Sequence, residues 1–428
     1  MSAFDVIIVG GRPAGASLAA RLGALEHRVL IVDRATFPSL PTVPSSPILH
    51  AGAMSLLDEI GIEESTYSDD SARSGAIAMT LVGAFSTRFP LPVSGGRAYV
   101  RGVDRQSFDL ALWNNLARYP SVTRREGFIV EDVVREAGVV VGVIGRDGDH
   151  DGHSETIRGR WVVGADGRYS TLAKRVGARV QEDFTKHLSS VYYADWADTR
   201  PSADAPPHTL HIVTDSKGTS ALLIPGPRQL LSVNIQQRAD LADFSGSAQA
   251  HYAHVLQSFA PVVERLTGAR QVTPLVGIKR IGNRMLEPAG RGWMLVGDAF
   301  HHKDPLDGQG IYDALLESKV LSEELHRGLS GEQSETATEL TYASRVRADT
   351  QPMFHETVRR LQREVFGAPS WLTKMTIVRW LLTDPKYQMR FTRFLNREVA
   401  AKGWLKPSFM AGVVWRGLRR DVRARFGT

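Results

Sequence analysis

The sequence predicts an α/β fold that is interrupted by an inserted antiparallel sheet and followed by a helical extension. Residues 4–9 form a short β-branched run that ends at glycine. An Ala/Leu-rich helix over 14–25 and a second strand over 28–32 follow it, which makes a βαβ unit. Several short strands between residues 187 and 234 then break the α/β alternation, which indicates an inserted sheet. Residues 345–428 have a helical pattern throughout.

The other elements are predicted from apolar runs that turn residues bound. Helices are expected over residues 52–60, 107–117, 247–266 and 311–326. Strands are expected in the alternating stretch 76–100, in a β-meander over 127–165, and over residues 190–196, 209–213, 221–224, 230–235 and 292–296.

Composition limits the class of protein. The chain has 428 residues, of which 43% are hydrophobic and 23% charged, so we expect a globular protein of two or three domains. Cysteine is absent, which excludes disulfides, Cys-ligated metals and a thiol nucleophile, and we expect no metal site. No apolar run reaches the roughly 18 residues of a membrane span, so no transmembrane segment is expected. The start of the chain lacks the basic region of a signal peptide, which predicts a cytoplasmic protein.

Charge is spread unevenly along the chain. Residues 345–428 hold 18 Lys and Arg but only 6 Asp and Glu, so this region carries +12 and the rest of the chain −6. Four of the eight tryptophans lie in it: Trp371, Trp380, Trp404 and Trp415. We expect a helical cap that docks through its tryptophans with its arginines in solvent. The alternatives are a docking surface for an acidic carrier protein or a reductase, or for a membrane surface. Nucleic acid is not expected, because a basic tail alone has no base-reading fold.

A glycine-rich turn joins the first strand to the first helix. It consists of Gly10, Gly11, Arg12, Pro13, Ala14 and Gly15. Gly10 permits the tight turn and Gly15 the close packing of helix on strand, while the helix N-terminus offers free N–H groups to a pyrophosphate. Asp33 follows Gly10 by 23 residues, near the roughly 20 expected of an acid that accepts hydrogen bonds from a ribose. The pattern predicts a dinucleotide site, with a plain βα turn as the alternative.

Arg12 departs from this pattern, because the usual second glycine lets the backbone approach the phosphates. An arginine there must either point its side chain away or place its cation on a phosphate or a neighbouring ligand.

Three separated segments together resemble the class A FAD-dependent monooxygenases, the p-hydroxybenzoate hydroxylase-like flavoproteins, to which geranylgeranyl reductases and flavin-dependent halogenases are related. The segments are the unit from Gly10 to Asp33, the stretch from Val163 to Ser170, and the stretch from Gly297 to Gly310. Their order and spacing match over about residues 1–330. The resemblance implies a GR2-type FAD-binding Rossmann-like domain with an inserted antiparallel β-sheet substrate domain.

On this basis we predict three parts. They are a discontinuous FAD-binding domain (1–75, 98–186 and 272–344), a β-sheet substrate domain (76–97 and 187–271) and a basic helical C-terminal extension (345–428).

The resemblance also implies which residues bind FAD. Asp298 would hydrogen-bond the ribityl chain, and Pro305 would fix the loop against the flavin. Backbone N–H groups near Gln309 would favour the negative charge of reduced flavin. Arg105 would reach the FAD from its helix, and Val130 would lie near the adenine. The full set is Gly10, Gly11, Arg12, Pro13, Ala14, Gly15, Asp33, Arg34, Arg105, Val130, Asp166, Asp298, Pro305, Gly308, Gln309, Gly310 and Ile311.

No catalytic residue is assigned. His301 and His302 are expected to shape their loop rather than to transfer protons, and His50 to be an exposed residue at a helix start. Two departures from the family pattern, Ala173 and Tyr312, bear on the contacts of a nicotinamide donor more than on those of FAD.

The activity that the resemblance implies is that of a hydroxylase or epoxidase. It would use NAD(P)H as a transient electron donor and O2, through a flavin C4a-hydroperoxide, on an aromatic or polyketide-like small molecule. A halogenase and an isoprenoid-type reductase are alternatives on the same fold. Ser220 and Leu222 replace the tryptophans that tryptophan-type halogenases carry before the segment Ile224-Pro225. A third alternative is a flavin-fold binding protein without enzymatic activity, and Arg12 is the residue that keeps it open.

Overall fold

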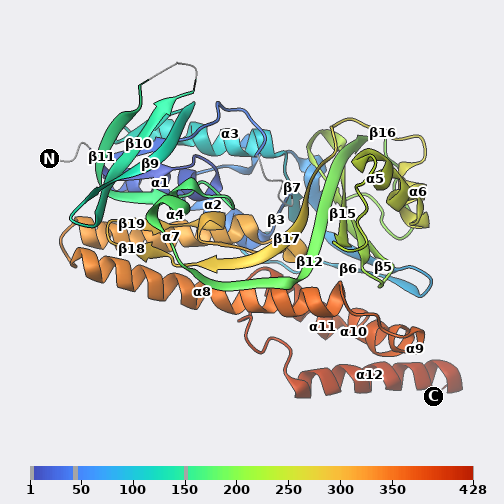
Figure 1. Ribbon diagram of the computed structural model, residues 1–428. Coiled ribbons are helices and arrows are strands. Elements are labelled where there is room, and N and C mark those ends of the chain that lie inside the picture. Colours follow the sequence, from blue (N-terminus) through green and yellow to red (C-terminus); the bar gives the residue numbers. More distant parts are fainter. Residues whose placement is uncertain (1–3, 42–46, 149–152, 428) are drawn as a thin grey trace.

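A twisted, largely parallel sheet forms one end of the molecule (Figure 1). The computed structural model describes residues 4–41, 47–148 and 153–427. The sheet has the order β18-β19-β11-β1-β2-β8, and β10 and β9 extend it from β11. Its strands are β1 (Phe4–Val9), β2 (Val29–Val32), β8 (Val122–Arg125), β9 (Phe128–Glu136), β10 (Val139–Asp147), β11 (Glu155–Gly164), β18 (Ala289–Gly290) and β19 (Trp293–Leu295).

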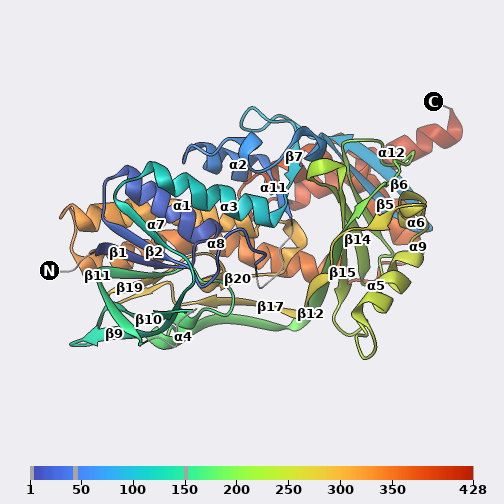
Figure 2. The same cartoon turned by 90° about the horizontal axis from the view of Figure 1, so that it is seen from above.

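The centre of this sheet is apolar on both faces. β1 pairs in parallel with both β2 and β11, and the residues from Val6 to Val9 and from Val29 to Val32 are all buried. Strands of this kind need cover on both sides. Figure 2 shows α1 (Pro13–Ala24), α3 (Arg105–Asn115) and α7 (Gly310–Leu329) on one side and the β9–β10 ribbon on the other.

The second sheet lies at the other end of the molecule. Its order is β20-β17-β12-β15-β14-β13-β5-β6, with β16 beside β12, and its pairs are antiparallel except for β13–β5. Its strands are β5 (Ala76–Leu81), β6 (Phe85–Pro90), β12 (Val180–Ala197), β13 (Thr209–Thr214), β14 (Thr219–Pro225), β15 (Leu231–Arg238), β16 (Arg270–Gln271), β17 (Val276–Leu286) and β20 (His301–His302).

Two long strands of the second sheet reach the first domain. β12 and β17 pair from Val180 with Leu286 to Tyr193 with Val276, and the green and yellow ribbons in Figure 1 run together between the two sheets. One predicted domain boundary, between residues 186 and 187, falls inside β12. The division into three parts stays a prediction.

Smaller elements complete the body. A three-stranded sheet has the order β3 (Ile48–Leu49), β7 (Val100–Gly102) and β4 (Arg73–Ser74). α5 (Ala248–Gln257) and α6 (Ala260–Leu266) cover the second sheet, where Tyr252 and Val262 pack with Tyr192 and Val233 in one buried cluster. The other helices of the body are α2 (Ala51–Asp58) and α4 (Thr171–Val176).

The C-terminal helices pack across both sheets. They are α8 (Glu335–Glu364), α9 (Trp371–Thr373), α10 (Arg379–Leu382), α11 (Pro385–Leu395) and α12 (Pro407–Phe426). Met353 of α8, Phe394 of α11 and Trp404 share a buried cluster with Ile77 and Ile224 of the second sheet.

The expected docking of the extension through its four tryptophans is wrong for two of them. Trp380 and Trp404 are buried, but the side chains of Trp371 and Trp415 are 66% and 64% exposed. These two lie at the surface of the extension instead.

The predicted α/β class, the inserted antiparallel sheet and the helical extension are confirmed. Within the described residues, no helix is both long enough and apolar enough to span a bilayer.

Candidate functional site

Three segments that are distant in sequence meet at the carboxyl end of β1. Gly10 has φ +107°, and a Cβ there would lie 2.4 Å from the carbonyl oxygen of Ala165. A Cβ on Gly297 would lie 2.9 Å from the Cβ of Ala14, and the Ser318 hydroxyl donates to the Ala14 carbonyl at 2.7 Å. The turn after β1 is therefore in direct contact with the two other segments that carry the resemblance.

The glycine-rich turn has the tight geometry that the sequence predicts. A Cβ on Gly15 would lie 1.8 Å from the carbonyl oxygen of Gly10, so only glycine fits there. The Gly11 N–H donates to the Asp33 carboxylate at 2.6 Å. Pro13 is the first residue of α1, where its missing N–H costs nothing.

Arg12 points its side chain away from the start of α1. Its guanidinium pairs with Asp109 of α3 and donates to the backbone carbonyls of Ser39 and Leu40 at 3.1 and 3.0 Å. Arg105 binds the same Asp109 carboxylate at 3.0 Å. Asp109 therefore fixes both arginines at this end of the site, and its single negative charge is shared between the two cations. Whether Arg12 also contacts a phosphate stays a prediction.

The other residues predicted at this end have separate surroundings. Asp166 accepts hydrogen bonds from the Ser170 hydroxyl and from the backbone N–H groups of Thr171 and Leu172, so its carboxylate caps α4. Burial raises its pKa in spite of these donors. Val130 is buried in β9, whereas Arg34 is exposed.

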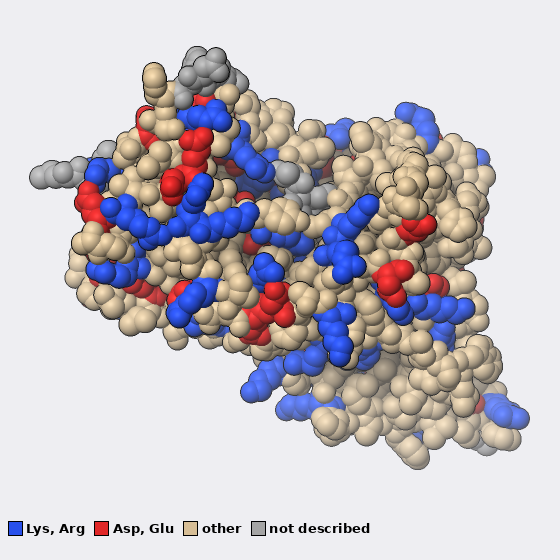
Figure 3. Space-filling model, in the orientation of Figure 1, with Lys and Arg blue, Asp and Glu red and all other residues tan. Residues whose placement is uncertain are grey.

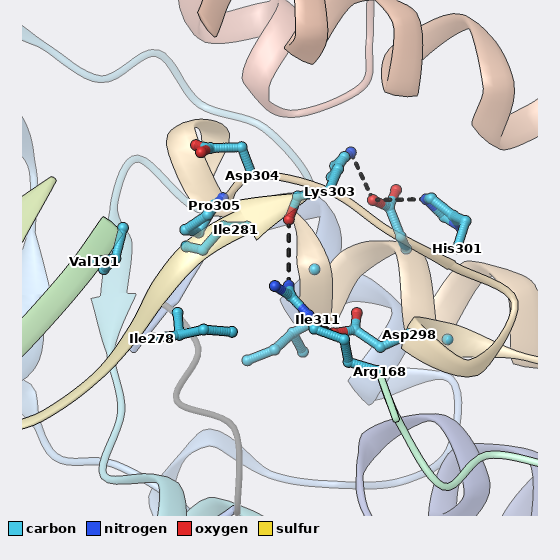
Figure 4. Close-up of a pocket in the computed structure, with 14 residues that line it drawn as sticks. Arg168, Val191, Ile278, Ile281, Asp298, His301, Lys303, Asp304, Pro305 and Ile311 are labelled. Carbon is cyan, nitrogen blue, oxygen red and sulfur yellow. Dashed lines mark hydrogen bonds and ion pairs between the residues drawn. The ribbon is translucent and has the colours of Figure 1, made fainter. Parts of the chain in front are cut away.

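A pocket lies where the Gly297–Gly310 segment faces the second sheet (Figure 4). Asp298, Pro305, Gly308, Gly310 and Ile311, all predicted site residues, line one part of it. Apolar side chains from β12 and β17 line another part: Val191, Ile278 and Ile281.

Two observations show that this pocket suits a bound group with polar edges. Among the described residues, the Arg168 Nε is buried without a hydrogen-bond partner, and a carboxylate oxygen of Asp298 lies 3.7 Å away. A Cβ added at Gly310, the first residue of α7, would meet no described atom within 4 Å. The pocket thus combines a buried cation with open space at a helix N-terminus, where negative charge is favoured. The residues fit the FAD that the resemblance implies.

Asp304 joins the loop of residues 297–310, called the flavin loop below, to the second sheet. Its carboxylate accepts hydrogen bonds from the Ser189 hydroxyl and from the Gln236 amide, and its backbone N–H donates to the Asn283 side chain at 2.7 Å. It also caps the short helical turn that begins at Pro305. Burial raises the pKa of Asp304 to about 6, although its hydrogen bonds oppose this.

A buried charge network lies behind the loop. The Lys303 ammonium is 2.7 Å from the Asp313 carboxylate, and Arg397 pairs with the other oxygen of the same group. His301 Nδ1 is 2.8 Å from the Glu317 carboxylate. Burial opposes the charge of His301, but the carboxylates of Glu317 and Asp313 outweigh it and raise the pKa of His301 to about 9. This arrangement supports a loop-shaping role for His301.

The C-terminal extension holds the same loop from outside. Arg360 of α8 pairs with Asp307, and the Thr357 hydroxyl donates to that carboxylate at 2.7 Å. Arg397 donates to the Gln309 side chain at 2.7 Å, and the Gln309 amide donates to the Leu395 carbonyl. The expectation that the arginines of this region lie in solvent is therefore wrong for two of them, because they pair with buried acids, Asp307 of the loop and Asp313 of α7.

His50 is also placed differently from the expectation. It is buried at the start of α2, and its Nε2 lies 3.0 Å from the Asp307 carbonyl oxygen. Folding brings the loop over it, so that it is not exposed.

Sequence reasoning missed several residues at this site: Asp109, Arg168, Lys303, Asp313, Arg360 and Arg397. Lys303 and Asp313 lie beside predicted site residues, and this adjacency was the available signal. Arg360 and Arg397 gave no signal, because they are two of many arginines in a basic region.

Comparison with known proteins agrees with this geometry. A family model described as "FAD binding domain" matches residues 3–357. A 6-methylpretetramide 4-monooxygenase of Streptomyces rimosus is 27% identical over 347 residues, 76% of each chain. A menaquinone reductase of Mycolicibacterium smegmatis is 28% identical over 337 residues, 75% of this chain and 76% of that protein. A solved flavin-dependent brominase superposes with a TM-score of 0.76 at 18% identity, over 97% of this chain and 99% of that one.

The family match covers most of the chain and includes all three segments that meet around the pocket. It confirms the resemblance to the class A flavoproteins, and it removes the flavin-free scaffold as an alternative. The chain belongs to the FAD-binding-domain family and is an FAD-dependent oxidoreductase.

Proposed function

We propose that the protein is a monooxygenase that hydroxylates or epoxidises a largely apolar aromatic or polyketide-like molecule, with NAD(P)H as a transient electron donor. The observation that carries this proposal is the wall of Val191, Ile278 and Ile281 on the pocket that the loop residues Asp298 and Pro305 also line. Bound FAD would supply the redox chemistry and the reaction with O2.

The chain's own residues would position the reactants and exclude water. The N–H groups at the start of α7, near Gly310, favour negative charge on the group that they face. Asp304 holds the loop against β12 and β15, so that the apolar wall and the loop keep their separation. A wall without polar side chains would keep water from the bound group, which would favour transfer of oxygen over release of peroxide.

The test combines turnover with isotope labelling. The FAD-loaded protein should consume NAD(P)H and O2 faster when a planar polycyclic phenol is present, and mass spectrometry should find one oxygen atom from ¹⁸O2 in the product. Unaltered substrate, or a product without the label, would contradict the proposal.

A variant of the apolar wall sharpens this test. Ile278→Ala should keep its FAD but release more hydrogen peroxide for each NAD(P)H consumed, because water then reaches the pocket. Ile377→Ala removes the same atoms from a surface residue that is 42% exposed, and it should behave like the unaltered protein.

Halogenation is the second candidate. The likeness to the brominase extends over the C-terminal extension, which here contacts the flavin loop. Adding bromide or chloride to the assay separates the two activities, since a halogenase incorporates halide and a monooxygenase does not. The similarity to a menaquinone reductase leaves a reductase as a further alternative. A reductase would reduce its substrate without O2.

The electron donor and the form of the substrate belong to the same proposal. If the purified protein oxidises neither NADH nor NADPH, we infer that a partner reductase supplies the electrons. An acidic carrier protein is a partner if a carrier-bound substrate reacts and the free acid does not.

A further inference from the structure

The last helix, α12, has one face that packs on the protein. Val413 and Gly417 are buried, and a Cβ on Gly417 would lie 2.2 Å from the Trp380 ring. At the edges of this face Arg416 pairs with Asp384, and Asp421 pairs with Arg379. The attachment of α12 therefore uses only this one side of the helix.

A second apolar stripe runs along the opposite side of α12. It consists of Trp415, Leu418, Val422 and Phe426, whose side chains are 64%, 43%, 45% and 68% exposed. Their spacing of three, four and four residues keeps them on one face of a helix, and at about 100° per residue that face is centred opposite Val413 and Gly417. Single exposed apolar residues are ordinary, but a continuous stripe marks an interaction surface.

Positive charge borders this stripe. Arg419 and Arg423 lie along one edge and Arg425 along the other, and all three are exposed. Between Pro407 and Phe426 the helix carries five arginines and a single acid, Asp421, which is paired with Arg379. In Figure 3 the lobe at lower right, where Figure 1 places α12, is mostly uncharged surface with blue side chains at its margins.

Two more exposed apolar side chains lie close to α12 in the fold. Trp371 and Leu372 are 66% and 65% exposed, and they directly precede the helical segment that packs beside α12. Figure 2 shows the C-terminal end of α12 extending beyond the other described elements.

We propose that the stripe of Trp415, Leu418, Val422 and Phe426 lies on an anionic phospholipid surface, with the stripe among the acyl chains and the flanking arginines at the headgroups. A helix with aromatic and aliphatic side chains on one face and arginines at its margins suits the plane of a lipid interface. A second copy of the chain suits it less, because the helix carries a net positive charge and would face the same charge. The negative remainder of the chain, −6 against +12 for residues 345–428, would turn the basic end toward an anionic surface.

Sedimentation of the full-length, FAD-loaded protein with lipid vesicles tests this proposal. The protein should sediment with vesicles that contain phosphatidylglycerol and much less with vesicles of phosphatidylcholine alone. Added salt should weaken the binding, because it screens the arginines.

Matched variants locate the contact. Trp415→Ser combined with Leu418→Ser should weaken binding to the anionic vesicles about tenfold or more, because two apolar side chains no longer leave water. Leu340→Ser removes an equally apolar side chain that is 67% exposed on α8, and it should leave the binding unchanged. Arg419→Gln combined with Arg423→Gln should weaken binding about thirtyfold, since each basic residue near an anionic surface adds about 1 kcal/mol.

The proposal is overturned if the unaltered protein does not sediment with the anionic vesicles, or if the stripe variants bind these vesicles as well as Leu340→Ser does. It is also overturned if sedimentation without lipid shows a dimer that the stripe variants abolish, or if the stripe binds only an acidic protein, since either result assigns it another partner. The flavin absorbance of each variant checks its fold separately, so this test does not depend on the proposed activity.

Discussion

The two ends of the cofactor site are held together in different ways. At the glycine-rich end, Gly10, Gly15 and Asp33 belong to one βαβ unit, and close backbone contacts fix the turn. At the pocket end, the loop around Asp307 is fixed by a buried ion pair with Arg360, and Asp313 at the start of α7 is paired with Arg397. Both arginines lie at least 50 residues further along the chain. A turn made by neighbours is recognisable in sequence, whereas a loop held by distant charges depends on the completed fold.

The C-terminal extension has two roles in the structure. Its inner residues, from α8 and the end of α11, pair with buried acids of the flavin loop and of α7. Its outer helix, α12, faces away from the site. Changes to the inner residues should therefore affect stability and FAD, while changes to α12 should affect neither.

Arg360→Met should cause the largest loss in the free energy of unfolding. This change removes the cation from two buried or partly buried carboxylates, Asp307 and Glu364, and an uncompensated buried charge lowers the free energy of unfolding by about 3–5 kcal/mol. Urea titration followed by tryptophan fluorescence measures it. Arg393→Met is the matched control, because Arg393 and its partner Glu398 are 56% and 37% exposed, and such pairs contribute about 1 kcal/mol or less. Equal losses in both variants would show that the inner network does not stabilise the loop.

The glycines of the two ends should respond differently to alanine. Gly15→Ala places a methyl group 1.8 Å from the Gly10 carbonyl oxygen. Overpacking of this kind lowers the free energy of unfolding by roughly 1–3 kcal/mol and should displace the turn from FAD. Gly310→Ala adds the same atom where nothing lies within 4 Å, so the free energy of unfolding should stay unchanged. Thermal unfolding and FAD content of both variants measure this. A Gly15→Ala variant that is stable and fully loaded with FAD would contradict this difference between the two ends.

The charge network should make stability depend on pH through His301. Its pKa is raised to about 9 in the folded chain, against about 6.5 when unfolded, so the folded state binds the proton more tightly. This contribution is complete below about pH 6.5 and is lost as the pH rises through 9. His301→Gln should therefore lose less stability than the unaltered protein between these pH values. Parallel urea titrations across this range provide the measurement. If the free energy of unfolding changed equally with pH in both proteins, a protonated His301 would be contradicted.

A smaller effect is expected from Asp298→Ala at the pocket. This residue is 41% exposed and lies beside Arg168, and its loss removes the proposed hydrogen bond to FAD. One hydrogen bond is worth about 0.5–1.5 kcal/mol, so FAD should bind up to about tenfold more weakly. Titration of the apoprotein with FAD, followed by flavin fluorescence, measures this. Asp298→Asn keeps a polar side chain and should recover part of the affinity, whereas full FAD affinity in Asp298→Ala would contradict the assigned role.

Much of the site was predictable because its residues act through local backbone. Gly10, Gly15 and Asp33 stand at spacings that one βαβ unit imposes, and Asp298, Pro305 and Gly308 stand in one recognisable segment. His50 was misplaced because its burial depends on Asp307, far along the chain. Trp371 and Trp415 were expected in the core because tryptophan is usually buried, but both lie at the surface.

The sequence by itself determined the α/β class and the glycine-rich turn, because spacing along a single chain segment controls backbone shape and close approach. The cofactor was implied by the resemblance of three separated segments to a known family. Only the tertiary structure decided which charges are buried, that Arg360 and Arg397 hold the flavin loop, and that α12 turns a second apolar stripe outward. The physical reason is that burial and charge pairing depend on distances between segments, and those distances exist only after the chain has folded.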